Sequence, residues 1–272
     1  MKAADARVLL TGATGGIGQA IAKELLARGA SVMLSGRSPG KLAALARQLG
    51  GAGDAAAHVA RVQWHAADLD DPASLPALRE AAASWRANVL VNAAGTPSFG
   101  RFESFGAEHF EQVLHTNLVA PMRLTQALLP VLRRQARAQV IHVGSALGRL
   151  GLPGYAVYSA SKFGLRGFCE ALRRELHGSP VRVQYLGPRS TRTGFNDARV
   201  EAYNRATGTA VDAPETVALA LVALLESEAA ERFLGLPEKL AVRLNGAVPQ
   251  WLDGAFDKHR ASLTPTPAET LP

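Results

Sequence analysis

The stretch of this sequence that decides the fold is Thr11-Gly-Ala-Thr-Gly-Gly-Ile-Gly18, which follows an apolar segment at residues 7–10 and leads into an amphipathic helical pattern. A strand, a glycine-rich turn and a helix in this order are typical of a dinucleotide-binding unit. Glycine permits a tight turn that brings backbone N–H groups close to a pyrophosphate, and the helix start adds partial positive charge. The stretch therefore favours a nucleotide-binding turn over an ordinary connection and predicts a Rossmann-type α/β fold.

Apolar segments and helical patterns alternate along the rest of the chain, which is typical of a doubly wound parallel sheet. We expect about seven strands with helices on both faces in a single domain, with strands at residues 7–10, 31–35, 62–65, 88–91, 139–143, 181–186 and 232–235. The domain would span residues 1–235, followed by an apolar and basic extension at 236–263 and a disordered tail at 264–272.

A polar, weakly patterned segment at about residues 194–212 has the profile of a lid beside a binding site, with one short helical pattern at 198–205. Directly after it, Asp212-Ala-Pro-Glu215 resembles a capping box for a helix at 216–225. Earlier in the chain, the pattern at 110–132 predicts one long helix. Asp70 or Asp71 is expected to cap a helix that Pro72 begins.

The end of the second predicted strand bears on the choice of cofactor. Folds that bind the ribose 2′-hydroxyl of NAD carry an acidic residue there. In this chain Gly36 occupies that position and Arg37 follows it, a suitable partner for the 2′-phosphate of NADP. Ser38 can cap the helix that Pro39 begins. We expect NADP(H) rather than NAD(H); the alternative for Arg37 is a surface charge at a helix start.

Composition and charge argue against several classes of protein. The net charge of the 272 residues is +7, but the basic residues are scattered and do not interleave with aromatic ones as on a single-strand nucleic-acid surface. No apolar run reaches the ~18–20 residues of a membrane span, and no signal peptide is evident. The single Cys169 excludes an intrachain disulfide, and the seven histidines form no ligand cluster. We expect a cytoplasmic protein without a metal or a nucleic-acid partner.

Tyr158 and Lys162 stand four residues apart, a spacing that puts two side chains on one helix face. A fixed ammonium favours the charged form of a phenol and so lowers its pKa from about 10. Ser145 ends the fifth predicted strand, and parallel strands bind ligands beyond their carboxyl ends. Asn117 lies inside the predicted long helix, where asparagine is a poor helix former. The alternative for the Tyr–Lys pair is a solvated pair on a surface helix.

In this order, these motifs resemble the short-chain dehydrogenase/reductase family over about residues 5–235. The glycine stretch is similar to the family's T-G-x-x-x-G-x-G through Gly12, Gly16 and Gly18. It is also similar to the T-G-x-x-G-x-x-G of the epimerase-like branch through Gly15. The compact chain, Asn92-Ala-Ala-Gly95 and the spacing of Ser145 from Tyr158-x-x-x-Lys favour the carbonyl-reductase-type branch.

The resemblance implies a catalytic tetrad of Asn117, Ser145, Tyr158 and Lys162. In it, Tyr158 would exchange a proton with the substrate oxygen, and Ser145 would orient the carbonyl. Lys162 would bind the nicotinamide ribose and lower the pKa of Tyr158, while Asn117 would support a proton-relaying water. The cofactor contacts that we expect are Gly12, Thr14, Gly16, Ile17, Gly18, Arg37, Ser38, Asp68, Leu69, Asn92, Ala93, Ala94, Gly95, Tyr158, Lys162, Pro188 and Thr193.

The family usually has a glycine after Pro188, and this chain has Arg189 instead. Arg189 would add an anion contact, recognise a substrate carboxylate or phosphate, or point to solvent. The expected substrate pocket is mainly apolar and consists of Ser145, Leu147, Leu152, Tyr155 and Phe195, with Leu150 and the lid up to Tyr203 as further candidates.

The leading functional hypothesis is an NADPH-dependent reductase of a small-molecule carbonyl, reversible as an alcohol dehydrogenase. The alternatives are a non-catalytic nucleotide sensor or scaffold, and an epimerase or dehydratase, which would need a larger C-terminal substrate domain. By resemblance, the protein would form a homodimer or homotetramer through the helices of Asn117 and Tyr158. Residues 236–256 would pack on the domain or on a partner subunit, or make a weak contact with a membrane surface.

Overall fold

The computed structural model describes residues 1–50, 61–235, 245–246 and 249–263. Its centre is a seven-stranded sheet in the order β3-β2-β1-β4-β5-β6-β7, in which every neighbouring pair is parallel. The sheet confirms the predicted doubly wound fold, with strand bounds within two residues of those expected. The strands are β1 (Arg7–Leu10), β2 (Ser31–Gly36), β3 (Val62–Ala66), β4 (Val89–Asn92), β5 (Ala138–Val143), β6 (Val181–Gly187) and β7 (Glu231–Phe233).

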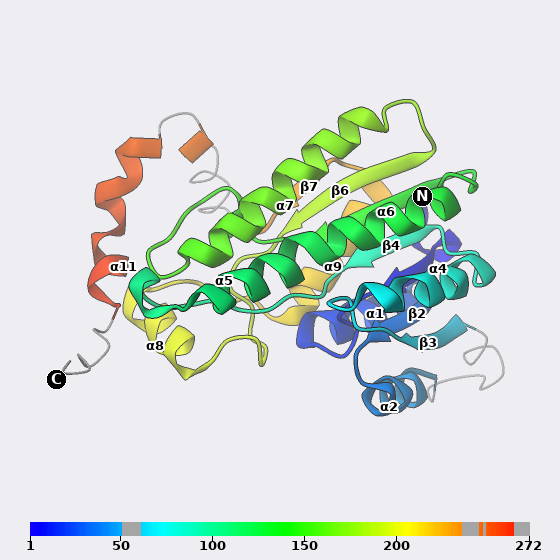
Figure 1. Ribbon diagram of the computed structural model, residues 1–272, viewed down its shortest axis with the longest axis horizontal. Coiled ribbons are helices and arrows are strands. Elements are labelled where there is room, and N and C mark those ends of the chain that lie inside the picture. The colour runs from blue at the N-terminus through cyan, green and yellow to red at the C-terminus, as the bar shows by residue number, and fades with distance from the viewer. Residues whose placement is uncertain (51–60, 236–244, 247–248, 264–272) are drawn as a thin grey trace.

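Helices cover both faces of the sheet (Figure 1). One face packs against α1 (Gly16–Ala27), α2 (Pro39–Gly50) and α9 (Pro214–Ser227). The other face packs against α4 (Leu75–Ser84), α6 (Ala120–Leu132) and α7 (Ala156–Glu175). Two further helices, α8 (Ala198–Thr207) and α11 (Asp257–Ala261), lie beside each other at one end of the molecule (Figure 1).

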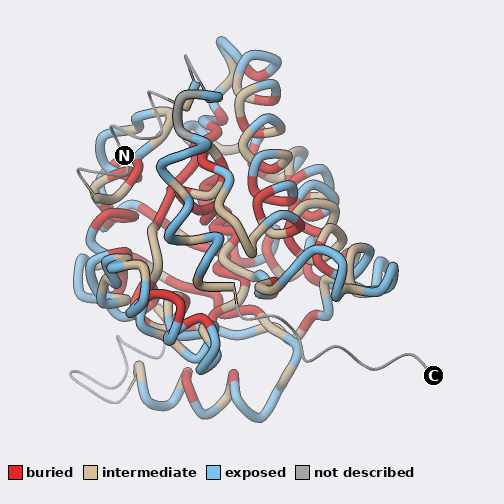
Figure 2. The backbone as a smooth tube through the Cα atoms, turned by 90° about the vertical axis from the view of Figure 1, so that its left-hand side faces the viewer, coloured by how far each residue is buried: buried red, intermediate tan, exposed pale blue. Residues whose placement is uncertain are grey.

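The apolar core forms two layers, one on each face of the sheet. Ile21, Leu42 and Leu221 belong to the layer under α1, α2 and α9, and Leu78, Leu124 and Leu172 belong to the layer under α4, α6 and α7. Figure 2 shows the buried stretches running through the middle of the molecule, with exposed residues on the outer sides of the helices. This core fixes the strands, so the loops at their carboxyl ends start from rigid positions.

The helix predicted at 110–132 is interrupted. The chain forms α5 (Ala107–Leu114), then a π-helical turn at His115–Val119, and then α6. Asn117 lies in the π turn and is 1% exposed. π turns are rare in proteins, but those that occur are often found at functional sites. Here the wider turn carries the buried Asn117.

Two predictions about helix starts have different outcomes. Asp71 caps a short 3-10 helix, η2 (Pro72–Ser74), because its carboxylate accepts a hydrogen bond from the Ala73 N–H at 2.9 Å. The capping box at Asp212 is wrong: α9 starts at Pro214 with Ala213 as its N-cap and no side-chain cap. The Asp212 carboxylate instead forms an ion pair with Arg189. The predicted lid helix at 198–205 is confirmed as α8, which extends to Thr207.

The predicted tail at 264–272 lies outside the described residues, as do 236–244 and 247–248 of the predicted extension. The described part of that extension forms a 3-10 helix, η6 (Pro249–Phe256), and α11. Among the described residues, no helix combines the length and hydropathy needed to cross a membrane.

Candidate active site

Two loops meet at the centre of the sheet, where the strand order changes direction between β1 and β4. Gly12 has a φ of +62°, and a Cβ atom there would lie 2.7 Å from the Ala94 nitrogen. The Thr11 hydroxyl accepts hydrogen bonds from the N–H groups of Ala93 at 3.2 Å and Ala94 at 3.4 Å. The glycine turn after β1 and the loop after β4 therefore form one surface at the position where such sheets bind ligands.

The start of α1 fits a pyrophosphate. Its N-cap, Gly15, makes no side-chain cap, so no side chain caps the first backbone N–H groups of the helix, at Gly16, Ile17 and Gly18. A Cβ atom at Gly16 would lie 2.6 Å from Cγ2 of Thr193, so Thr193 covers the glycine turn from the other side. The turn thus offers backbone donors to an anionic ligand, with Thr193 packed beside them.

The carboxyl end of β2 borders the same turn. A Cβ atom at Gly36 would lie 3.8 Å from the Thr14 hydroxyl oxygen. Arg37 follows Gly36 and is exposed. Ser38 accepts a hydrogen bond from the Lys41 N–H at 3.4 Å, in agreement with its predicted capping role. A cation therefore stands at the position where the family's folds distinguish NAD from NADP.

Two further predicted cofactor contacts, Asp68 and Leu69, follow β3. Asp68 is exposed, and its carboxylate accepts a hydrogen bond from the Asp70 N–H at 3.1 Å. Leu69 is partly buried against the core. Both residues lie at the carboxyl edge of the sheet, beside the end of β2.

Asn92 at the end of β4 directs its side chain into the protein. The side chain is 4% exposed, and its Nδ2 lies 3.5 Å from the Thr125 hydroxyl and 3.3 Å from Nδ1 of His142. A contact from Asn92 to a cofactor would therefore involve its backbone. The following residue pair, Ala93 and Ala94, faces the glycine turn as described above.

Asn117 and Lys162 converge on Gly95. A Cβ atom at Gly95 would lie 3.2 Å from Oδ1 of Asn117 and 3.8 Å from Nζ of Lys162. Oδ1 of Asn117 accepts a hydrogen bond from the Thr96 N–H at 2.8 Å, and Nδ2 donates to the Thr96 carbonyl at 3.0 Å and to the Ser161 hydroxyl at 3.2 Å. The π turn therefore fixes the loop after β4 against α7. The sequence analysis missed Ser161, whose only signal is its place before Lys162.

Tyr158 lies next to Ser145 and Lys162. Its ring centre is 5.4 Å from Nζ of Lys162, and the Ser161 hydroxyl donates to its carbonyl at 2.6 Å. Burial raises the pKa of Tyr158 above its ordinary value, and a hydrogen bond with the Ser145 side chain acts in the opposite direction. The predicted lowering of this pKa by Lys162 is therefore not found: burial is the largest influence on the pKa of Tyr158, and the group that lowers it is Ser145. Burial also lowers the pKa of Lys162 to about 8.

Tyr185 fixes the backbone of Ser145. Its hydroxyl accepts a hydrogen bond from the Ser145 N–H at 2.9 Å and donates one to the Ser145 carbonyl at 2.8 Å. A Cβ atom at Gly144 or Gly148 would lie 2.1 Å from the Tyr185 ring or hydroxyl, so glycine is required at both positions. Sequence reasoning missed Tyr185; the two glycines beside Ser145 are the signal that could have indicated it.

Aromatic side chains cover the open side of Tyr158. Phe195 is 37% exposed and meets the Tyr158 ring edge-on, with 6.2 Å between ring centres. The Tyr155 ring lies 4.9 Å from that of Phe99 and 5.8 Å from that of Tyr203 on α8. Burial raises the pKa of Tyr155 to about 12. The site is thus walled by rings on the substrate side.

Residues 6–204 match the model of the family described as short chain dehydrogenase. The chain belongs to this family. This short-chain dehydrogenase is 34% identical over 235 residues to nodulation protein G of Rhizobium sp., covering 82% of this chain and 91% of the relative. It is 32% identical over 228 residues to the ketoacyl reductase HetN of Nostoc sp., covering 82% of this chain and 76% of that relative.

Among solved structures, a short-chain dehydrogenase from Sphingobium yanoikuyae in complex with NADPH matches with a TM-score of 0.74 and 28% identity, covering 91% of this chain and 95% of that one. These findings make this short-chain dehydrogenase an NAD(P)-dependent oxidoreductase.

The predicted pocket leucines of the short-chain dehydrogenase have different surroundings. Leu147 is partly buried, and its N–H donates to the Ser145 hydroxyl at 3.1 Å. Leu152 is partly buried and packs against the core layer under α7. Leu150 is 7% exposed and belongs to that same layer.

Arg189 of the short-chain dehydrogenase forms an ion pair with Asp212, and its side chain is 23% exposed. Its guanidinium donates to both carboxylate oxygens of Asp212, at 2.9 and 2.8 Å. The preceding Pro188 accepts a hydrogen bond from the Ala146 N–H at 2.7 Å and so lies beside the loop of Ser145. The departure from the family's usual glycine therefore produces an internal ion pair.

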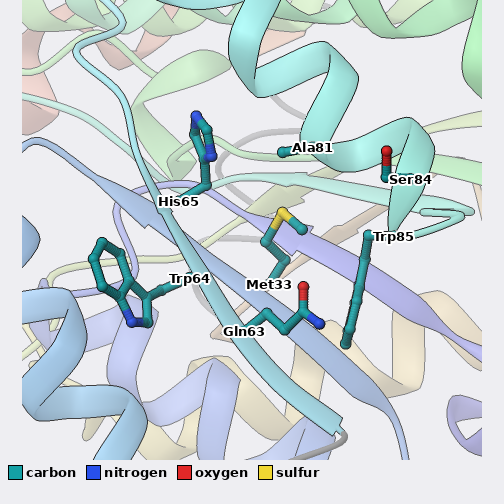
Figure 3. Close-up of a pocket in the computed structure, with 7 residues that line it drawn as sticks. All are labelled: Met33, Gln63, Trp64, His65, Ala81, Ser84 and Trp85. Carbon is teal, nitrogen blue, oxygen red and sulfur yellow. The ribbon is translucent and has the colours of Figure 1, made fainter.

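A separate hollow of about 300 Å³ lies between β3 and α4, away from the tetrad. It is lined by Met33, Gln63, Trp64, His65, Ala81, Ser84 and Trp85. In Figure 3, the Trp64 ring points away from Gln63 and His65. The indole of Trp85 lies on the opposite side of the hollow from Trp64. None of the tetrad residues borders this hollow.

Proposed function

We propose that this short-chain dehydrogenase uses NADPH to reduce the carbonyl group of a mainly apolar small molecule to an alcohol, or catalyses the reverse reaction. The observation that carries the proposal is the convergence of Ser145, Tyr158 and Lys162 beside the glycine turn, with Tyr158 under aromatic rings. The ketoacyl reductase name of the Nostoc relative and the NADPH in the Sphingobium structure support it.

Bound NADPH would supply the hydride. Tyr158 then donates its phenolic proton to the substrate oxygen, and the Ser145 hydroxyl donates a hydrogen bond that stabilises the charge developing there. The raised pKa of Tyr158 keeps the phenol protonated at neutral pH, the form that donates a proton during reduction. Lys162 binds the ribose, and Asn117 holds the loop after β4 in place.

The choice of NADP(H) rests on the end of β2. Gly36 leaves no carboxylate to bind a ribose 2′-hydroxyl, and the exposed Arg37 offers a fork of donors to a 2′-phosphate. Ser38, Asp68 and Leu69 would border the adenosine half of the cofactor.

The Tyr158→Phe variant tests the proposed reaction. We expect the turnover of a ketone active with the wild type to fall by roughly 10²- to 10⁴-fold, because the proton donor is lost. NADPH affinity, measured by fluorescence titration, should stay within about twofold because the glycine turn is untouched. Full turnover in this variant would refute the proposal. NADPH binding without turnover of any ketone by the wild type would favour the sensor or scaffold hypothesis.

We also propose that copies of this chain associate through α6 and α7. The support is a pair of exposed apolar side chains, Met122 on α6 at 38% and Phe163 on α7 at 43%. Sedimentation at micromolar concentration measures the oligomeric state, and a monomer would exclude the homodimer and the homotetramer.

A further inference from the structure

We propose that the ion pair between Arg189 and Asp212 anchors both ends of the lid, defined from here on as residues 190–212, and thereby sets the affinity for cofactor and substrate. This inference rests on the proposed function, because it assigns a positioning role at that same site. The two residues contact neither the glycine turn nor Tyr158 in the contacts described above. They act through the segment that they enclose.

The base of the lid is closed by side chains and backbone together. Arg189 lies two residues after β6, behind Pro188, and Asp212 lies two residues before α9, which begins at Pro214. The guanidinium and the carboxylate form a bidentate pair whose side chains are only 23% and 11% exposed. Bidentate ion pairs that are shielded from solvent are stronger than single, exposed ion pairs. Beside it, the Asp212 N–H donates to the Ser190 carbonyl and the Arg192 N–H to the Asp212 carbonyl, both at 2.8 Å.

A second set of hydrogen bonds braces the lid just above its base. The Ser190 hydroxyl accepts from Nδ2 of Asn196 at 3.3 Å and from Nδ2 of Asn204 at 3.0 Å. Asn204 lies on α8 and is 6% exposed. The start of the lid is therefore tied to its helix, and displacement of the base would carry the whole segment with it.

Three contacts connect the lid to the site. Thr193 covers Gly16 of the glycine turn. Phe195 meets the ring of Tyr158, with 6.2 Å between ring centres. The Tyr203 ring packs on Tyr155 at 5.8 Å. One anchor thus determines the positions of the Thr193 side chain beside the glycine turn, of the Phe195 ring against Tyr158, and of the Tyr203 ring against Tyr155.

The replacement of the family's usual glycine explains what the anchor adds. Glycine has no side chain to reach Asp212 and gives the chain more backbone freedom. Arg189 instead holds the exit of β6 to the start of α9 with two charge-assisted hydrogen bonds. The closed lid is therefore more populated before ligands bind, and a more populated competent state raises apparent affinity.

Loss of the pair tests the anchor. In Arg189→Ala we expect the dissociation constant of NADPH and the KM of the ketone to rise by roughly threefold to tenfold, since a charge-assisted pair contributes about a factor of ten or more in equilibrium. kcat should stay within about twofold, because the tetrad is unchanged. Amide hydrogen exchange should accelerate within residues 190–212 and not in the sheet. Arg189→Lys, which keeps the charge without the fork, should lie between wild type and Arg189→Ala.

The matched control is Arg199→Ala, which removes an ion pair with Asp197 inside the same lid. Those side chains are 73% and 51% exposed and do not join the lid's ends. We therefore expect no change in the affinity for NADPH or in the rate of amide hydrogen exchange within the lid. A swapped double variant, Arg189→Asp with Asp212→Arg, should recover part of the lost NADPH affinity.

The proposal would be overturned if Arg189→Ala kept the wild-type affinity for NADPH and the wild-type rate of amide hydrogen exchange in the lid, even if the melting temperature fell. Equal loss of affinity in Arg199→Ala would overturn it as well. NADPH binding and hydrogen exchange need no turnover. Failure of the anchor is therefore distinguishable from failure of the proposed reaction, which the Tyr158→Phe variant tests separately.

Discussion

At the scale of single residues, Arg37 carries the proposed preference between the two nicotinamide cofactors. In Arg37→Ala, we expect the free energy of NADPH binding to weaken by about 1.5–3 kcal/mol, because a charge-assisted contact to the 2′-phosphate is lost. NADH binding should hardly change, since NADH has no phosphate at that position. Fluorescence titration with both cofactors measures the two affinities, and equal losses for both would contradict the assignment.

Motif spacing could predict which residues of this site come together, but not their electrostatics. Tyr158 and Lys162 were expected from the sequence because one helix face fixes their distance. The sign of the shift in the pKa of Tyr158 was missed, because burial depends on other segments of the chain, such as the one that places the Phe195 ring against Tyr158. The sequence also did not indicate that Arg189 pairs with Asp212, because the two residues are 23 positions apart along the chain.

At the scale of elements, β6 and β5 are joined by Tyr185 as well as by their backbone ladder. The expected result of Tyr185→Phe is a roughly tenfold lower kcat, because the Ser145 N–H and carbonyl lose their buried partner and the serine is held less firmly. NADPH affinity should be retained, since the glycine turn lies between β1 and α1 and does not contact Tyr185 in the contacts described for Gly12 to Gly18. Stopped-flow measurement of NADPH oxidation separates these quantities. An unchanged kcat with a lower melting temperature would assign Tyr185 a purely structural part.

Strand and helix positions followed from apolar periodicity, whereas local irregularities did not. The pattern at 110–132 is continuous in sequence, and the π turn at His115–Val119 depends on the hydrogen bonds of Asn117 to Thr96 and Ser161. Likewise, Asp212 had the sequence of a capping residue, but the Arg189 guanidinium, from the segment after β6, pairs with its carboxylate instead. In both cases a tertiary contact overrides a local preference.

At the scale of the whole molecule, His142 couples stability to pH. It is fully buried in β5, with its ring edge-on to Phe168 at 5.7 Å, and burial lowers its pKa to about 3. In the unfolded chain the pKa is about 6.5, so between these values the unfolded state binds more protons and the free energy of unfolding falls as pH falls. From pH 7 to 5 this contribution should be about 2 kcal/mol.

Urea unfolding of the wild type and of His142→Leu at pH 7 and pH 5 measures this contribution. The variant has no imidazole to protonate, so its loss of stability over this interval should be smaller by about 2 kcal/mol. Identical losses in both proteins would show that His142 does not govern the pH response.

The division of the sheet at β1 and β4 also has a consequence for how the chain folds. Val8 on β1 pairs with Val32 on β2 on one side and with Val89 on β4 on the other. The strands β1 to β3 can therefore assemble from the first 66 residues, whereas the pairing of β1 with β4 requires a segment much further along the chain. Pairing of segments distant in the chain is the slow part of folding for such topologies. The proposed cofactor crevice lies on this seam and would be complete only after the two halves dock. During refolding, NADPH binding should therefore recover later than the helical secondary structure. The cofactor would then report on the last step of assembly.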